Sequence, residues 1–250
     1  MMKNLLLMIQ LFTKFPIKKE IEFDQDEFSR GIIFFPVIGL LIGAVACIAA
    51  YLSGLFFTRE IAAICMIASV ALFTGALHLD GLADTMDGIL SARNREQMLL
   101  IMKDSRIGTH GVLALLGVIS MKYLFLLEVS SENFLSMVLA LPIIGRTAMG
   151  ILLWGTRYAR EEGLGNLFIG KTRLKETIIT GVIGFLLVYV ILGLSGIAAF
   201  GLVIMLVYLF RIQVERLLGG ITGDVLGAMN ELSELLFIPI FILIERGGIL

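Results

Sequence analysis

The sequence is poor in charged residues, cysteine and histidine. Only 16% of its 250 residues are Asp, Glu, Lys or Arg, whereas a soluble domain averages about 25%. Its two cysteines lie in apolar runs and form neither a disulfide framework nor a Cys-x-x-Cys metal site. A net charge of −1 excludes a general basic surface for nucleic acid. Walker, HExxH and GxSxG motifs are absent, so ATP hydrolysis, zinc proteolysis and serine hydrolysis are unsupported.

Hydrophobic residues make up 58% of the chain and gather in seven runs. A helix needs about 20 apolar residues to cross a bilayer. The runs cover residues 31–57, 61–79, 111–127, 134–154, 177–194, 197–210 and 225–244. We therefore expect an all-α fold, a polytopic membrane helical bundle of about seven transmembrane helices. Residues 1–250 form a single integral membrane domain, since no linker or repeat divides them.

The basic residues alternate between connections. Sixteen of the 20 Lys and Arg precede the first run or lie between runs two and three, four and five, or six and seven. The remaining connections hold Arg59, Lys122 near a span end, and Arg246. Basic loops stay in the cytoplasm, so we expect the N-terminus inside and the C-terminus outside.

Residues 1–30 are predicted to form a cytoplasmic or interfacial segment. Leu5, Met8, Ile9 and Phe12 follow the i, i+3, i+4, i+7 spacing of an amphipathic helix. Lysines flank this stretch, including Lys18 and Lys19, and no cleavage site follows it. The pattern is typical of a helix lying on the membrane surface; a plain cytosolic tail is the alternative.

The first acidic stretch is HLDGLADTMDG, at the cytoplasmic end of the second run. Asp80, Asp84 and Asp87 fall on one stripe of a helix. Carboxylates so placed repel one another unless a cation lies between them. Carboxylate oxygens suit Mg²⁺, which is commonly shared with substrate phosphates. The alternative is a solvated helix end, although the residues between the acids are mostly small or apolar.

The second stretch is KDSRIGTHG, before the third run. Asp104 and Arg106 are close enough to pair, and Arg106 could instead clamp a phosphate. Gly108 and Gly111 would let backbone approach a ligand. A charged cap on a membrane helix explains the stretch equally well.

The third stretch is GGITGDVLGAMNELSE, in which Asp224 and Glu231 share a helix face and Glu234 lies about 60° away. Acids inside a membrane span are costly and mark functional sites; an interfacial acid cluster is the alternative. Arg146, inside the fourth run, is expected to pair with one of these acids. The basic loop 157–175, which contains Arg160, binds an anionic substrate or merely follows the positive-inside rule. His78 and His110 are more often structural than catalytic in such settings.

These blocks, with GRTAMG and AREEGLG, resemble the cobalamin synthases, the adenosylcobinamide-GDP ribazoletransferases. The opening LFTKFPI and FFPVIGLLIG also fit, and the resemblance runs in order over nearly the whole chain. It implies a magnesium-dependent transferase in the cytoplasmic membrane of a prokaryote. The implied reaction joins adenosylcobinamide-GDP and α-ribazole, or α-ribazole 5′-phosphate, with release of GMP. The product is adenosylcobalamin or its 5′-phosphate, the last assembly step of the nucleotide loop.

Roles for the acids and arginines follow as hypotheses. The two acidic stripes should form one site although about 140 residues separate them. We expect Mg²⁺ to be bound by Asp80, Asp84, Asp87, Asp224, Glu231 and Glu234. We expect Asp80, Asp84 and Glu231 to be catalytic, and substrate phosphate to be held by Arg106, Arg146 and Arg160. Which carboxylate takes the proton is open, and so is the oligomeric state.

Two other functions fit some of these features. A CDP-alcohol phosphotransferase also uses an acidic membrane helix, but its DGxxAR pattern is absent, since Gly81 is followed by Leu82, Ala83 and Asp84. An ion-coupled transporter would place its substrate near the bilayer midplane. The acids here gather at the predicted cytoplasmic ends, which favours chemistry on a soluble nucleotide.

Overall fold

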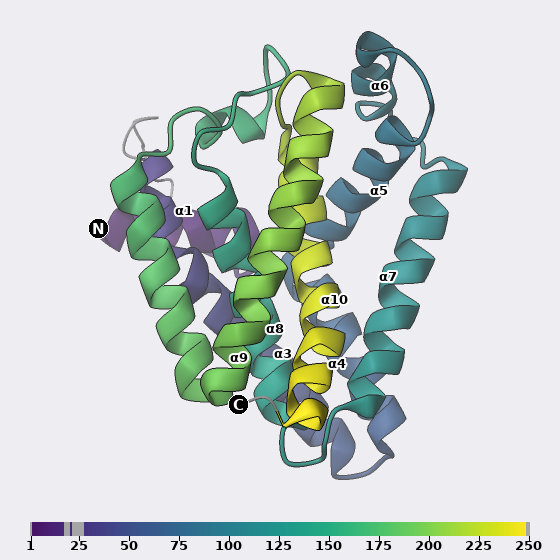
Figure 1. Ribbon diagram of the computed structural model, residues 1–250, viewed down its shortest axis with the longest axis vertical. Coiled ribbons are helices and arrows are strands. Elements are labelled where there is room, and N and C mark those ends of the chain that lie inside the picture. Colours follow the sequence, from purple (N-terminus) through teal and green to yellow (C-terminus); the bar gives the residue numbers. More distant parts are fainter. Residues whose placement is uncertain (1, 18–20, 22–27, 249–250) are drawn as a thin grey trace.

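The computed structural model describes residues 2–17, 21 and 28–248 and confirms an all-α bundle, with one isolated β-bridge in this part of the chain (Figure 1). The predicted flanking residues Lys18 and Lys19 lie outside the described residues. The elements are α1 (Met2–Phe12), η1 (Arg30–Phe34), α3 (Phe35–Gly54), α4 (Arg59–Thr74), α5 (Leu77–Ile89), α6 (Arg95–Ile101), α7 (Thr109–Glu128), α8 (Phe134–Leu152), η2 (Leu164–Leu167), α9 (Leu174–Leu218) and α10 (Gly223–Gly247).

Five of the described helices are long and apolar enough to cross a membrane, and a bent pair, α4 with α5, makes up to six. Helix α9 is itself two helices that meet at Gly193, where the backbone leaves helical geometry at φ 64° and ψ −154°. The rings of Phe185 and Phe200, on the two arms, lie 4.6 Å apart between centroids. In a straight helix those residues would be about 22 Å apart along the axis, so α9 folds back on itself, as Figure 1 shows. The seven-span count and the orientation stay predictions.

The second apolar run is not one continuous helix, which corrects the predicted span 61–79. Helix α4 ends at Thr74, and both Gly75 and Ala76 adopt left-handed backbone angles. Helix α5 then leaves at 89° to α4. The residues next to the turn, 72–79, are mostly apolar, so the hydrophobic run does not reveal it. The turn directs the acidic stretch of α5 onto α10, with which it packs closely.

The predicted sixth span, 197–210, also extends further than expected. The second arm of α9 continues to Leu218 and includes Arg211. That side chain is buried and donates to the carbonyl oxygens of Leu152 (2.9 Å) and Trp154 (3.0 Å) at the end of α8. The buried charge of Arg211 is thereby paired with carbonyl oxygens that the end of α8 leaves free.

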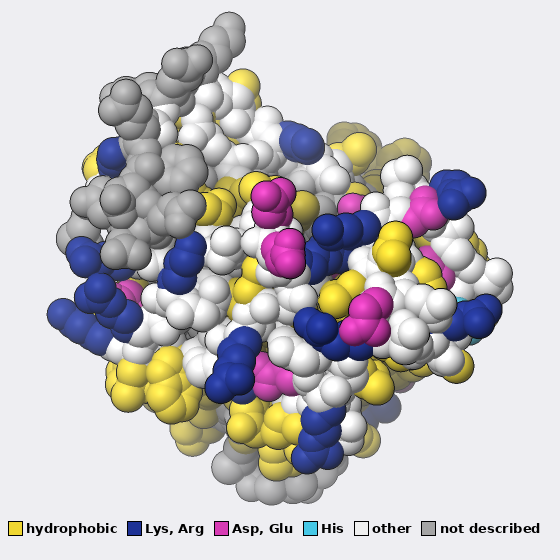
Figure 2. Space-filling view, turned by 90° about the horizontal axis from the view of Figure 1, so that it is seen from above, with side chains coloured by type: hydrophobic (Ala, Val, Ile, Leu, Met, Phe, Trp, Pro, Cys, Tyr) yellow, Lys and Arg dark blue, Asp and Glu magenta, His cyan; other side chains and the backbone are white. Residues whose placement is uncertain are grey.

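The basic connections meet at one end of the bundle, as the alternating charge pattern predicted. Arg95 of α6 donates to the carbonyl oxygen of Leu218 (2.7 Å) and to that of Ala159 (3.3 Å). Lys and Arg side chains interleave with acids on this face (Figure 2). At the opposite end Arg246 pairs with Glu128 at 2.9 Å.

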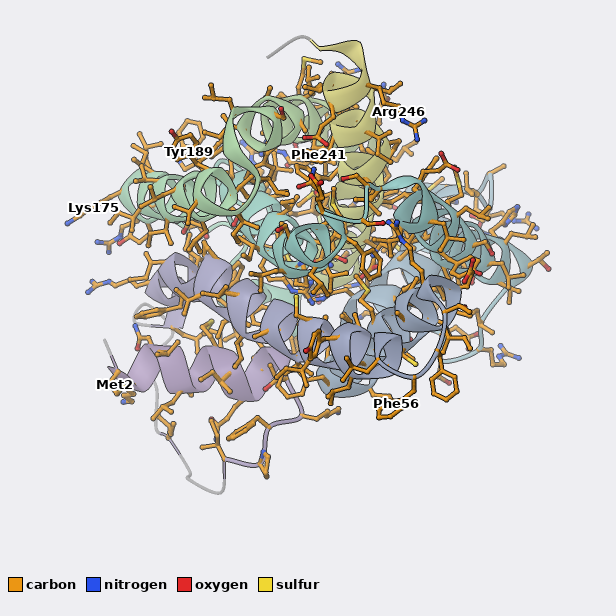
Figure 3. All side chains as sticks on the ribbon, turned by 90° about the horizontal axis from the view of Figure 1, so that it is seen from below. Met2, Phe56, Lys175, Tyr189, Phe241 and Arg246 are labelled. Carbon is orange, nitrogen blue, oxygen red and sulfur yellow. The ribbon has the colours of Figure 1, made fainter. Side chains whose placement is uncertain are left out.

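Apolar side chains cover the outside of the bundle. Leu72, Val190 and Leu243 are each at least two-thirds exposed. Seen from the opposite end in Figure 3, Phe56 and Tyr189 point away from the helices, whereas Phe241 lies among them. A surface this apolar suits lipid rather than water.

Candidate active site

Helices α5 and α10 touch at two glycines. A Cβ atom on Gly81 would lie 2.8 Å from the carbonyl oxygen of Asp224. A Cβ atom on Gly227 would lie 3.0 Å from the carbonyl oxygen of His78. Only glycine permits such backbone approach. The acidic stretch of α5 is thereby held against the first turn of α10.

A short extended segment brings an arginine to the same place. Ala159 donates its backbone N–H to Ile221 at 2.9 Å, and Ile221 donates to Arg157 at 2.8 Å. Thr222 then caps α10 by accepting from the N–H of Val225 at 3.3 Å. This pairing places a guanidinium nitrogen of Arg160 2.7 Å from a carboxylate oxygen of Asp224.

The acid centre comprises Asp80, Asp84, Asp224 and Arg160. The carboxylate of Asp84 is close enough to Asp224 and Asp80 to be repelled by both, while Arg160 attracts it. Three carboxylates thus face one guanidinium, which leaves the acid centre with excess negative charge. Among the described residues, no group of three or more His, Cys, Asp or Glu side chains is close enough to hold a metal ion by itself.

A cavity of about 130 Å³ opens beside the acid centre. We call it the aromatic cavity. Its walls include Phe12, Phe35 and Phe168, and Asp80 and Asp224 line it too. Helix α1 is therefore part of the site, because it supplies Phe12.

Asp87 does not face the acid centre's arginine but binds the start of α7. Its two carboxylate oxygens accept the backbone N–H groups of Gly108 (2.7 Å) and Gly111 (2.8 Å). An anion at a helix N-terminus is favoured by the helix dipole. The expected backbone approach at these glycines thus has a partner within the protein, the Asp87 carboxylate.

Arg106 lies on the exposed connection before α7 and pairs with Asp104 at 2.6 Å, as the sequence predicted. Hydrogen bonds from Arg106 lower the pKa of Asp104 to about 2. The Arg106 side chain is 87% exposed. Nothing in this geometry joins it to the acid centre, so phosphate binding by Arg106 stays a prediction.

Glu231 and Glu234 belong to a second cluster, about 10 Å and 15 Å further along α10 from Asp224. Lys122 of α7 lies 2.6 Å from Glu231 and 2.8 Å from Glu234. Arg146 pairs with the other oxygen of Glu234, which confirms the expected acidic partner for this arginine. All four side chains are buried. Two cations balance two anions, so this cluster is neutral without a metal.

His78 links the second cluster to the site. A guanidinium nitrogen of Arg146 lies 3.1 Å from its Nδ1, and His78 also lines the aromatic cavity. Sequence reasoning missed this link and missed Lys122, which it placed at a span end. A lone lysine within an apolar helix was the available signal for a buried partner of the acids.

The structure therefore unites Asp80, Asp84, Asp224 and Arg160 across about 140 residues of sequence. Glu231, Glu234 and Arg146 lie together in the neighbouring cluster instead. Figure 2 looks onto the end of the bundle where the acidic and basic side chains gather.

Comparison with known proteins shows the family of the chain. A sequence model described as cobalamin-5-phosphate synthase matches residues 4–242. A protein of Clostridium novyi, adenosylcobinamide-GDP ribazoletransferase, is 35% identical over 250 residues, which is all of both chains. Enzymes of the same name from Klebsiella pneumoniae and Shigella flexneri are 41% and 42% identical, over 95% and 92% of this chain and 98% and 96% of theirs. No solved structure gives a significant match.

The matching segment begins in α1, which lines the aromatic cavity, and continues through α5 and most of α10, which hold the carboxylates. Relatives above 30% identity cover the chain from end to end. The chain belongs to the cobalamin-5-phosphate synthase family.

Proposed function

We propose that the acid centre performs the reaction for which the relatives are named, the transfer of adenosylcobinamide phosphate from its GDP ester to α-ribazole. A ribose hydroxyl oxygen of α-ribazole, or of its 5′-phosphate, forms a bond to the phosphorus that carries the cobinamide. The bond from that phosphorus to GMP breaks, and GMP leaves. The observation that carries the proposal is the meeting of Asp80, Asp84 and Asp224 with Arg160 beside a cavity that Asp80 and Asp224 line.

One or two of the carboxylates of Asp80, Asp84 and Asp224 would hold Mg²⁺ together with the substrate, since the three are not close enough to hold an ion by themselves. Carboxylate oxygens are its preferred ligands, and one or two of them suffice when substrate phosphates and water complete the shell. The excess negative charge of the acid centre fits such an ion, whereas the neutral second cluster does not need one. When bound, Mg²⁺ neutralises charge on the pyrophosphate.

The remaining steps fall to the protein's own groups. A carboxylate of the acid centre accepts the proton of the attacking hydroxyl, which is the role of a general base. Arg160 offers guanidinium N–H groups to phosphate oxygens. A groove of about 500 Å³ adjoins the acid centre, and its charged lining residues are Arg95, Lys103 and Arg160 with Glu96 and Glu161. The three cations outnumber the two acids, which suits the GDP moiety of the donor.

The second cluster and Asp87 are proposed to position these groups. Arg146 supports α5 through His78 and α10 through Glu234. Asp87 fixes α5 to α7. Direct metal binding by Asp87, Glu231 and Glu234, and phosphate binding by Arg146, stay hypotheses from the sequence.

We further propose that the bundle lies in the cytoplasmic membrane of a prokaryote, with the N-terminus and the acid centre on the inside. The gathering of basic connections at the end that holds the acid centre supports this orientation. The soluble nucleotide substrates are available on that side.

Release of GMP from adenosylcobinamide-GDP, with α-ribazole phosphate and Mg²⁺, tests the function. The purified full chain should release GMP only when both substrates are present, and Asp224→Asn should lower the rate by at least 100-fold. Glu128→Gln, an exposed acid at the opposite end of the bundle, is the matched control and should retain the wild-type rate. Absence of GMP from the wild-type reaction would overturn the proposal.

A further inference from the structure

The aromatic cavity is mostly apolar. Phe12, Phe35 and Phe168 pack around it, with ring centroids 5.0 to 6.5 Å apart. Among the described residues that line it, only His78, Asp80 and Asp224 carry polar side chains. Such a space accepts a flat hydrophobic group and penalises one with several polar edges.

His78 presents a single hydrogen-bond donor. Arginine can only donate, so the contact from Arg146 makes Nδ1 of His78 the acceptor. The ring is then neutral and its proton sits on Nε2. His78 is 4% exposed, and this Nε2 has no hydrogen-bond partner among the residues described. The side chain lines the aromatic cavity and also a smaller cavity beside Lys122 and Glu231. A buried donor without a partner is costly and calls for a ligand acceptor.

We infer that the aromatic cavity binds the base of the nucleoside acceptor, an inference that rests on the proposed function. The base of α-ribazole is dimethylbenzimidazole, a flat and hydrophobic bicycle. One ring nitrogen bears the ribose, which leaves the other as the single acceptor, to match the Nε2–H of His78. With the base enclosed, the ribose lies at the mouth, beside Asp80 and Asp224.

The other substrate groups fit this cavity poorly. Guanine presents several donors and acceptors on its edges, which the phenylalanine walls would leave unpaired. The corrin ring is far larger than a nucleoside base and carries many amide side chains. The cavity therefore selects the acceptor, and the groove at Arg95 and Lys103 remains for the donor nucleotide.

Acceptor analogues test the inference on the unmodified enzyme. GMP release is measured with α-ribosides of dimethylbenzimidazole, of benzimidazole and of dimethylindole, which has carbon in place of the acceptor nitrogen. Removing both methyl groups should lower kcat/KM on the order of tenfold. Removing the nitrogen should lower it roughly threefold to tenfold. Equal kcat/KM values for all three ribosides would overturn the inference.

The variant His78→Asn tests whether His78 supplies the hydrogen bond to the base. Its amide oxygen can still accept from Arg146, while the Nε2–H is lost. Dimethylbenzimidazole and dimethylindole ribosides should then react equally well, with the KM of the adenosylcobinamide-GDP donor unchanged. Phe168→Leu should raise the KM of the acceptor and leave the KM of adenosylcobinamide-GDP unchanged. Phe56 is exposed and remote from the cavity, so Phe56→Leu should change neither KM.

Failure of the inference differs visibly from failure of the proposed function. If His78→Asn slows all acceptors equally and keeps their ratio, His78 only supports the fold and the base lies elsewhere. If Phe168→Leu raises the donor KM instead, the cavity binds the donor. In both cases the wild-type enzyme still releases GMP, whereas failure of the proposed function would abolish that release.

Discussion

Loss of the buried lysine in the second cluster should destabilise the bundle strongly. Lys122 contacts Glu231 at 2.6 Å and Glu234 at 2.8 Å, and all three side chains are at most 9% exposed. In Lys122→Met, Arg146 alone would face two buried carboxylates. Removing one partner of a buried ion pair typically costs about 3–5 kcal/mol. For a chain of this length, that corresponds to a Tm lower by roughly 6–20 °C.

Restoring neutrality should recover most of that loss. Thermal unfolding in detergent compares Lys122→Met with the double variant Lys122→Met/Glu231→Gln, in which one cation faces one anion again. Lys175→Met removes an exposed lysine and serves as the control, with a change within about 0.5 kcal/mol. A Tm for Lys122→Met within 1 °C of wild type would refute the reasoning. So would a double variant as unstable as the sum of its two single variants.

Further predictions concern the contacts that shape the site. Gly227→Ala should separate α5 from α10 by a few tenths of an ångström, cost about 1–3 kcal/mol and reduce GMP release more than the Tm shift explains. Asp87→Asn should weaken the contact with the start of α7 by about 1 kcal/mol, seen as a lower Tm. Deleting residues 1–12 should leave membrane insertion intact but raise the acceptor KM, because Phe12 is lost from the cavity; failed insertion would contradict this. Glu231→Gln should lower both stability and activity, and a selective change in Mg²⁺ dependence would instead support the sequence-based metal role.

The sequence predicted the class of fold because a helix that crosses a bilayer must be apolar along its length, which shows in the composition. Runs of about 20 apolar residues, broken by basic connections, leave few alternatives to a helical bundle. The expected pairing of Arg146 with an acid was also confirmed, because a charge inside a membrane protein needs a partner. The family followed from whole motifs and is confirmed by the comparisons.

What the sequence could not give depends on tertiary geometry. The turn at Gly75 and Ala76 lies inside an apolar run, so the predicted span 61–79 continued from α4 into the first residues of α5. Helical spacing placed Asp80, Asp84 and Asp87 on one stripe of the helix. It could not show that backbone N–H groups at the start of α7 would bind the carboxylate of Asp87. Lys122 looked like a residue at a membrane boundary because its partners come from another helix, about 110 residues later.

The central claim is that the acids of α5 and α10 act as one site. Rates of GMP release for Asp84→Asn, Asp224→Asn and the double variant test it most directly, with matched Mg²⁺ titrations. Each single variant should lose activity by orders of magnitude, and the double variant should lose little more, because residues that act as a unit cannot be lost twice. A double variant that loses the full product of the two effects, or a single variant near the wild-type rate, would contradict the claim.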